Sequence, residues 1–175
     1  LGILGGENQE SAALAVSADG SVVVGTSTSP LSDYGEAFRW ERSTGMVGLG
    51  DLPGGYAESS ATALSADGSV VVGRSTSALA PNSFGEAFRW TAATGMAGLG
   101  VLTSSGFDYS FASGVSADGT AITGTASTEQ GHEIFLWTAL DGMVPLGSLE
   151  GKPYPTSYGS DLSADGSVLV GHTDY

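Results

Sequence analysis

The stretch ATALSADGSVVVGRSTS, which runs from Ala61 to Ser77, predicts two β-strands joined by a tight turn. Small and apolar residues precede the turn, and the valines that follow it have the β-branched side chains that strands favour. Asp67 and Gly68 stand between the two runs, and both residue types tolerate the positive φ values of a two-residue hairpin turn. We therefore expect an antiparallel hairpin whose turn is centred on Asp67 and Gly68.

Close copies of this hairpin occur along the whole chain of 175 residues. The Ser-Ala-Asp-Gly tetrad begins at Ser17, Ser65, Ser116 and Ser163, at intervals of 48, 51 and 47 residues. A second landmark, GEAFRW in its clearest copies, ends at Trp40, Trp90 and Trp137, and a third, GLGDL or its variants, begins at Gly48, Gly98 and Pro145. The first four residues, LGIL, copy the third landmark. The sequence thus predicts a single repeat domain over 1–175, with units at about 1–47, 48–97 and 98–144 and a partial unit at 145–175.

Each full unit contains four segments with strand composition; in the first unit they are ALAVSA, SVVVGTS, EAFRW and MVGLGDL. Four antiparallel strands repeated about every 40 to 50 residues are typical of a β-propeller blade. We therefore predict an all-β fold of about three and a half blades, with LGIL as a strand of a neighbouring blade. A stacked β-repeat without a closed ring is the alternative. Because open blade edges favour pairing, we expect this chain to form part of a longer or assembled propeller.

The burial pattern of the strands supports blades. Val22 to Val24 are consecutive, as are Val70 to Val72, whereas a strand with one solvated face alternates apolar and polar residues. Such a run fits a strand that is covered on both faces by neighbouring blades. In the third strand Phe38 and Trp40 share one side, and we expect this aromatic pair and its copies, including Trp90 and Trp137, to hold adjacent blades together.

The unit as a whole resembles the extracellular HAF-repeat family of bacterial proteins. The resemblance covers essentially the whole chain and rests on SADGSVVVG, AFRW and GLGDLPGG as they stand here. It implies a large secreted or surface-anchored bacterial protein with β-propeller-like repeats. The histidine that names the family is replaced by Glu36, Glu86 and Glu133, so no role of that imidazole carries over.

Composition excludes several partners. Five Lys and Arg stand against 19 Asp and Glu, which gives a formal net charge of -14, so nothing here neutralises a row of phosphates and we expect no nucleic-acid partner. The chain has no cysteine, which excludes disulfides and thiolate metal sites and fits an extracellular bacterial repeat protein. No run of 18 apolar residues predicts a membrane-spanning helix. The first residues belong to the repeat, so we expect any secretion signal to lie outside this chain.

The candidate catalytic and metal-binding residues have simpler structural explanations. Turn geometry accounts for an Asp before a Gly, and no closely spaced carboxylate cluster suggests calcium. The tetrad residues assigned to the turns are Asp19, Asp67, Asp118 and Asp165. We expect Glu36, Glu86 and Glu133 at solvated strand ends, and His132 and His172 on the surface or in loops. No serine has a base and an orienting group placed by the repeat, so we predict no catalytic residue, no metal and no cofactor.

Loops of variable length join the second and third strands: TSPLSDYG, SALAPNSFG and STEQG. These loops and the crossovers between units carry aromatic residues among polar ones, and such rings can stack on sugars. The candidate ligand-binding residues are Tyr34, Phe84, Phe107, Tyr109 and Tyr154, and Tyr158 is a further ring of the same kind. The alternative is that these rings only cover blade edges.

These observations favour a non-enzymatic extracellular module for adhesion, surface display or scaffolding, with a cell-surface or glycan partner and self-assembly through open blade edges. A carbohydrate-binding propeller is the second hypothesis. The third is a glycan-active enzyme whose site is completed by other blades, because paired carboxylates can cleave sugar bonds in an acidic protein.

Overall fold

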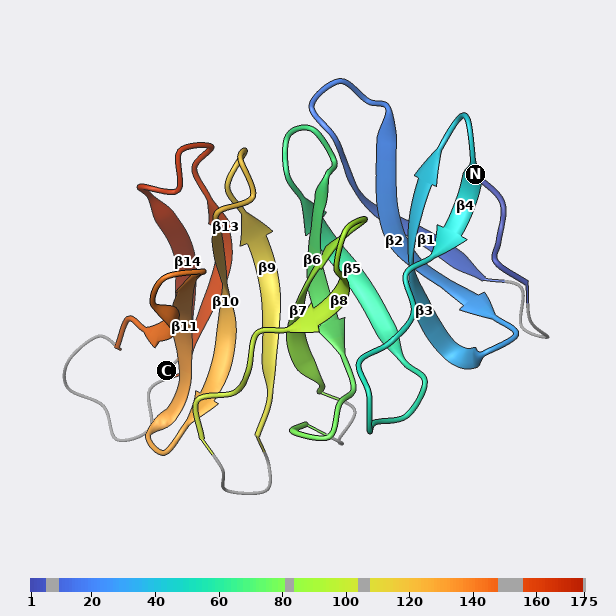
Figure 1. Cartoon of the computed structure of the whole chain (residues 1–175). Helices are drawn as coiled ribbons and strands as arrows, with labels where there is room; N and C mark the ends of the chain where they lie inside the picture. The colour runs from blue at the N-terminus through green and yellow to red at the C-terminus, as the bar shows by residue number, and fades with distance from the viewer. Residues whose placement is uncertain (6–9, 81–83, 104–107, 148–155, 175) are drawn as a thin grey trace.

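The chain forms an all-β, propeller-like repeat fold, which confirms the predicted fold class. The computed structural model describes residues 1–5, 10–80, 84–103, 108–147 and 156–174, and these contain strands and no helix. The units stand side by side from the N-terminal to the C-terminal end of the molecule (Figure 1). Each complete unit is an antiparallel sheet of four strands in chain order.

The strand bounds follow the repeat. The first unit contains β1 (Ser11–Val16), β2 (Val22–Ser29), β3 (Ser32–Glu41) and β4 (Gly45–Gly48). The second contains β5 (Ser59–Leu64), β6 (Val70–Ser75), β7 (Glu86–Thr91) and β8 (Gly95–Gly98). The third contains β9 (Ser110–Val115), β10 (Ala121–Thr128), β11 (Gly131–Thr138) and β12 (Gly142–Pro145). The fourth contains β13 (Thr156–Leu162) and β14 (Leu169–Asp174), and one parallel pair, His132 with Thr156, joins it to the third sheet.

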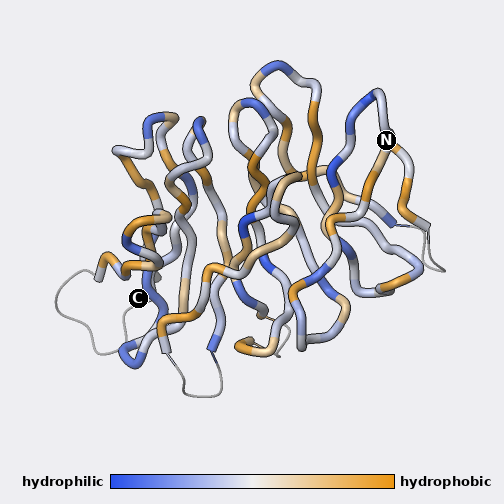
Figure 2. Tube along the Cα trace, in the orientation of Figure 1, coloured by the Kyte–Doolittle hydropathy of each residue, from blue (hydrophilic) through white to orange (hydrophobic). Residues whose placement is uncertain are grey.

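The four tetrad turns lie along one rim, at the top in Figure 1. Backbone hydrogen bonds connect them in series, from Ala18 N to Ala66 O, from Ala66 N to Ala117 O and from Ala117 N to Ala164 O, at 2.9, 3.0 and 2.8 Å. The chain is hydrophilic at these turns and more hydrophobic along the strands below them (Figure 2). Each unit is therefore joined to the next at this rim by a backbone hydrogen bond.

The turn itself differs from the prediction. Gly20 N donates to Ser17 O, so Ala18 and Asp19 occupy the centre of a β-turn and Gly20 follows them with a φ of 74°. The predicted two-residue turn centred on Asp-Gly is therefore wrong. The longer loop forms because the Asp19 carboxylate organises it, accepting hydrogen bonds from Ser17 Oγ at 2.7 Å and Ser21 N at 2.9 Å.

The hydrophobic core lies between neighbouring units. In the first cluster Val22 and Val24 of β2 pack with Val71 of β6 and Phe88 of β7. A second cluster repeats this arrangement one unit further. Its buried members are Val70, Val72, Ala87, Ala112, Ile122, Ala126 and Phe135. Each complete sheet therefore has a front face, which meets the next unit, and a back face, which meets the preceding one.

The second unit shows why consecutive valines are needed. Val70 and Val72 lie in the second cluster and Val71 in the first, and all three are buried. This is the arrangement expected of a strand with a neighbour on both faces. Phe38, Phe88 and Phe135 are completely buried, while Trp40, Trp90 and Trp137 are half-buried.

Two other local expectations need correction. Most of TSPLSDYG and STEQG is strand rather than loop, because β2 and β10 continue into tight hairpins with β3 and β11. The N-terminal LGIL is not a strand. Instead it copies the connection between units: Leu4 N bonds Ser27 Oγ at 3.0 Å, just as Leu52 N bonds Ser75 Oγ at 2.9 Å.

Candidate functional site

The ring cluster is a group of aromatic and imidazole side chains that spans the second, third and fourth units. We define it as Phe84, Tyr109, Phe111, His132, Tyr158 and His172. Tyr109, just before β9, is its centre: its ring centroid lies 5.4 Å from that of Phe84, 6.4 Å from that of Phe111 and 5.2 Å from that of His132. Segments that are distant in the sequence therefore meet at Tyr109.

Tyr109 also has a polar partner. Its hydroxyl oxygen lies 2.7 Å from His132 Nδ1 across the β9–β10–β11 sheet. Burial raises the pKa of the Tyr109 phenol to about 12, and the nearby Tyr158 phenol adds to this shift. The phenol is therefore protonated at neutral pH and able to donate a hydrogen bond to an unprotonated Nδ1.

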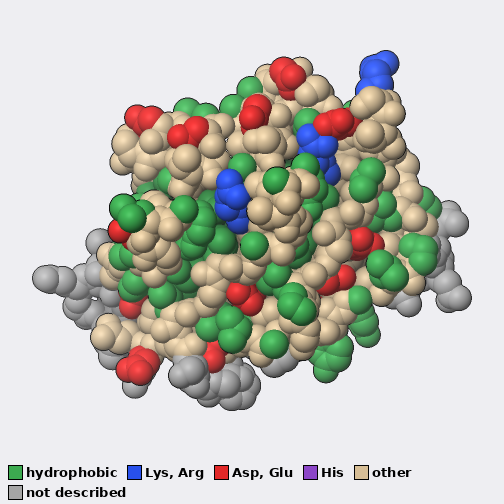
Figure 3. Space-filling model, in the orientation of Figure 1, with side chains coloured by type: hydrophobic (Ala, Val, Ile, Leu, Met, Phe, Trp, Pro, Cys, Tyr) green, Lys and Arg blue, Asp and Glu red, His purple; other side chains and the backbone are tan. Residues whose placement is uncertain are grey.

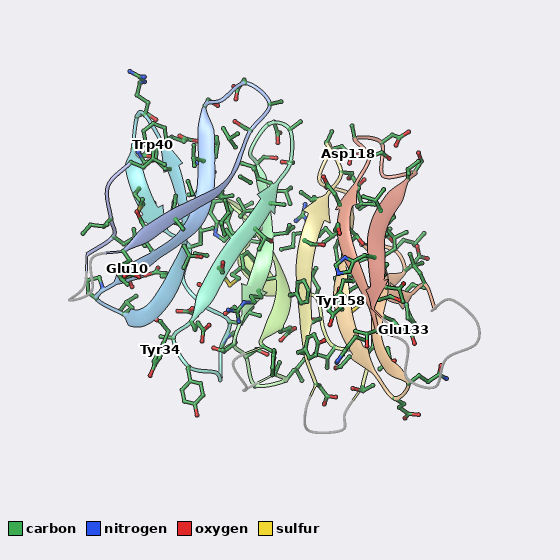
Figure 4. All side chains as sticks on the ribbon, turned by 180° about the vertical axis from the view of Figure 1, so that it is seen from behind. Glu10, Tyr34, Trp40, Asp118, Glu133 and Tyr158 are labelled. Atoms are coloured by element: carbon green, nitrogen blue, oxygen red, sulfur yellow. The ribbon has the colours of Figure 1, made fainter. Side chains whose placement is uncertain are left out.

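The fourth unit contributes a second pair of rings. Tyr158 of β13 and His172 of β14 are cross-strand partners, and their rings stack with centroids 5.0 Å apart and planes inclined by 26°. Tyr158 lies in the half of the molecule away from the tetrad rim, on which Asp118 stands (Figure 4). The ring cluster thus lies on the side opposite the tetrad turns.

The structure brings together two of the five predicted ligand-binding residues, Phe84 and Tyr109. Tyr34 lies in the first unit and is 82% exposed. Phe107 and Tyr154 fall outside the described residues. Phe111, His132 and His172 were not among the predicted site residues, although each breaks the repeat, and that departure is the signal by which the sequence could have revealed them.

The four tetrad aspartates form the same turn network in every unit. In the second unit Asp67 Oδ1 accepts hydrogen bonds from Ser65 Oγ, Ser69 N and Ser69 Oγ, and Ser65 Oγ accepts one from Val70 N. The Ser65 hydroxyl, followed by the Ser69 amide and hydroxyl, lowers the pKa of Asp67 to about 2. Each carboxylate is used within its own turn, and no group of three or more acidic or histidine side chains among the described residues is placed to hold a metal ion.

The glutamates of the third strands are not solvated, which corrects the sequence-based expectation. Glu36, Glu86 and Glu133 are all buried. Glu86 Oε1 accepts a hydrogen bond from Gly100 N at 2.9 Å and lies over Gly98, where an added Cβ would stand only 2.1 Å from that oxygen. Glu36, which accepts a hydrogen bond from Gly50 N in the same way, and Glu86 therefore fix the connection to the next unit.

Glu133 differs from its two counterparts. Pro145 stands where the first two units have Gly48 and Gly98, and the Glu133 side chain instead accepts a hydrogen bond from Thr128 Oγ1 at 3.1 Å. The change follows from the space available, because a glycine leaves room for the carboxylate and a proline does not.

The two ends of the repeat array expose apolar faces. Val168 and Val170 of the fourth unit are 57% and 53% exposed, whereas their equivalents Val70 and Val72 are buried in the second core cluster. At the other end Val16 is exposed, whereas its equivalent Leu64 packs against the first cluster. The fourth unit thus presents a front face, and the first unit a back face, of the kind that pack together inside the molecule.

Comparison with known proteins supports the fold. No protein-family model matches the chain, and no curated protein matches it. Among solved structures, the crystal structure of TolB from Acinetobacter baumannii is similar, with a TM-score of 0.54 and 14% sequence identity. The match covers 97% of this chain and 44% of that one, so this chain spans less than half the length of TolB. At this identity the likeness concerns the fold, which is of the β-propeller type.

Within the described residues no helix is long and apolar enough to cross a membrane.

Proposed function

We propose that this chain is a non-enzymatic extracellular repeat module for adhesion, surface display or scaffolding, and that it associates through its two end faces. The single observation behind the proposal is the exposure of Val16, Val168 and Val170, whose equivalents help to form the core inside the array. An extracellular location is supported by the resemblance to HAF repeats and by the absence of cysteine.

The two end faces are complementary for a structural reason. Within the chain, the front face of one unit packs on the back face of the next at successive contacts. The two strands of the fourth unit and the back face of the first unit around Val16 repeat parts of these two surfaces, so further repeats or a second copy of the chain can dock there head to tail. A head-to-tail contact leaves one free face at each end of the pair, so further copies can add. The product is either a closed ring or a filament.

Self-association tests this proposal. Sedimentation equilibrium of the purified chain over a wide concentration range should show dimers and larger species. The double variant Val168→Lys and Val170→Lys places charges on the front face of the fourth unit, and we expect it to remain monomeric with an unchanged circular dichroism spectrum.

Leu140→Lys is the matched control. Leu140 is also an exposed apolar residue, but it lies in the turn between β11 and β12, away from both end faces. We expect this variant to associate like the unmodified chain. A chain that stays monomeric at every concentration, or a Leu140→Lys variant that loses association equally, would contradict the proposal.

A further inference from the structure

We infer that the ring cluster is a binding site for neutral carbohydrate chains. The inference does not depend on the proposed self-association, because its central rings, those of Phe84, Tyr109 and His132, belong to the second and third units and not to the two end faces. Its support comes from the repeat itself, from the exposure and tilt of the rings, from the polar groups among them and from the sign of the nearby charges.

The fold does not require these rings. Glu10 and Glu58 occupy the position of Tyr109 in the first two units, and Ala12 and Ser60 occupy that of Phe111. The corresponding strands, β1 and β5, still form the same hairpins with β2 and β6 as β9 forms with β10. Since blades form without aromatic residues at these positions, the rings of the third and fourth units serve something other than blade formation.

Phe84 and Tyr34 show how the cluster is assembled. Both stand directly before the glycine that precedes the third-strand glutamate. Phe84 faces Tyr109 of the next unit, and the two rings pack with centroids 5.4 Å apart. Tyr34 has Glu58 as the equivalent residue of its next unit, and its ring is left 82% exposed. The same backbone position thus joins a group of rings in one unit and stands outside it in another.

The exposure of the rings suits a ligand that lies across them. Phe84 is 62% exposed and His172 is also exposed, while Tyr109, Phe111, His132 and Tyr158 are half-buried. The rings are thus held in place by the sheet but remain partly open to solvent. Sugar rings have apolar faces of C–H groups, and these pack on aromatic faces in the same way as other apolar surfaces.

The ring tilts favour a sugar over an organic cation. Tyr109 and Phe111 are nearly parallel at 9°, and Tyr109 is inclined by 33° to Phe84 and by 44° to His132. A quaternary ammonium group is usually bound where several ring faces surround one point. Here the rings form two groups, one around Tyr109 and one made of Tyr158 and His172, and they are spread over three successive units, which suits an extended chain of sugar units.

Polar groups lie between the rings. The Tyr109 hydroxyl and the His132 imidazole form one hydrogen-bonded pair, and Tyr158 and His172 add a second hydroxyl and a second imidazole. Sugar hydroxyls both donate and accept hydrogen bonds, as phenols and imidazoles do. The ring cluster therefore offers the mixture of apolar faces and fixed polar atoms that small polar ligands require.

The charges nearby exclude an anionic glycan. Asp108 directly precedes Tyr109, and Glu133 directly follows His132. The chain carries a formal net charge of -14. Acidic side chains are also scattered over the face shown in Figure 3, on which the histidines of the ring cluster are not visible. Uronic acids or sulfated sugars would meet repulsion here, which leaves neutral chains.

Isothermal titration of the intact chain with neutral hexasaccharides tests the inference. The probes are cellohexaose, xylohexaose, maltohexaose and chitohexaose, and the hexamer of galacturonic acid serves as the anionic comparison. We expect at least one neutral probe to bind and the anionic hexamer not to bind. Phe84→Ala, which removes an exposed ring, should weaken the binding by about tenfold.

Tyr34→Ala is the matched control, because it removes an exposed ring from the same backbone position of the first unit. We expect it to leave the affinity unchanged. Tyr109→Phe keeps the ring and removes the hydroxyl, and should weaken binding less than Phe84→Ala does. The inference fails if no neutral probe binds, if Tyr34→Ala weakens binding as much as Phe84→Ala, or if tetramethylammonium binds in place of the sugars. All titrations are repeated with the Val168→Lys and Val170→Lys variant, so that loss of association and loss of sugar binding are scored separately.

Discussion

The second and fourth units carry nearly the same hairpin, yet they bury it to different extents. SADGSVVVG of the second unit and SADGSVLVG of the fourth differ at one position. Val72 is completely buried in the second unit, while its equivalent Val170 is 53% exposed. The hairpin sequence therefore makes the strands, but the neighbouring unit decides which side chains become core.

The largest effect on stability should come from a completely buried aromatic ring in the core between two units. Phe88→Ala removes a side chain that is completely buried between the first and second units, and we expect it to lower the free energy of unfolding by about 3–5 kcal/mol. Urea denaturation followed by circular dichroism measures this loss.

Phe38→Ala is the comparison from an end unit. Phe38 is equally buried, but the back face of the first unit has no complete sheet before it in the described residues. Because such a site can collapse more readily around a cavity, we expect a smaller loss than for Phe88→Ala. Equal losses would show that the end units are packed as rigidly as the interior.

A smaller effect should separate two equivalent valines. Val72→Ala shortens a buried side chain and leaves a cavity, and we expect it to lower the free energy of unfolding by about 2 kcal/mol. Val170→Ala shortens the equivalent side chain of the fourth unit, which is exposed, and should lower the free energy of unfolding by less than about 0.5 kcal/mol. The difference in urea midpoint between the two variants measures how much of the burial depends on a neighbour. Both variants are compared at a protein concentration at which the chain is monomeric. If Val170→Ala then cost as much as Val72→Ala, the front face of the fourth unit would be covered within the chain itself.

The smallest effect concerns the tetrad turns, which should not depend on neighbours. Asp67 and Asp165 both have a pKa of about 2 against an ordinary value of 3.8, mainly because the serine two residues earlier donates its hydroxyl to each carboxylate. Since the folded pKa is the lower one, this stabilisation is complete above the unfolded pKa and is lost as the pH falls from about 4 to about 2.

Thermal unfolding across that pH window measures the contribution. Asp67→Asn and Asp165→Asn should each reduce the dependence of the melting temperature on pH, and by similar amounts, because both carboxylates are exposed and act within their own turns. A clear difference between the two variants would show that the neighbouring unit stabilises the turn as well.

Much of the fold was predictable because the same short sequence landmarks recur at nearly constant spacing along the chain. The order of strands, the antiparallel sheets and the double-sided burial of Val70 to Val72 follow from the spacing of landmarks and from residue type. The turn was mispredicted because the Asp-Gly pair alone suggests a two-residue turn, while the hydroxyl of the serine before it favours a longer one. Glu86 was expected in solvent because nothing in EAFRW shows that the chain returns over it 14 residues later, where Gly100 N meets its carboxylate.

The ring cluster was only partly predictable. Phe84 and Tyr109 were predicted as ligand-binding residues because they are aromatic residues among polar ones. The sequence did not show that their rings face each other from two successive units. His132 was expected on the surface or in a loop, yet it is half-buried in β11 and its Nδ1 is within hydrogen-bond distance of the Tyr109 hydroxyl.

By itself the amino-acid sequence determined the strands and the period, because these depend on residues only a few positions apart along the chain. The tertiary structure alone decided which valines are sealed, which glutamates are buried and which rings meet. Those outcomes depend on how closely neighbouring sheets approach each other. That distance is set by the side chains between the sheets, and these come together only when the whole array has formed.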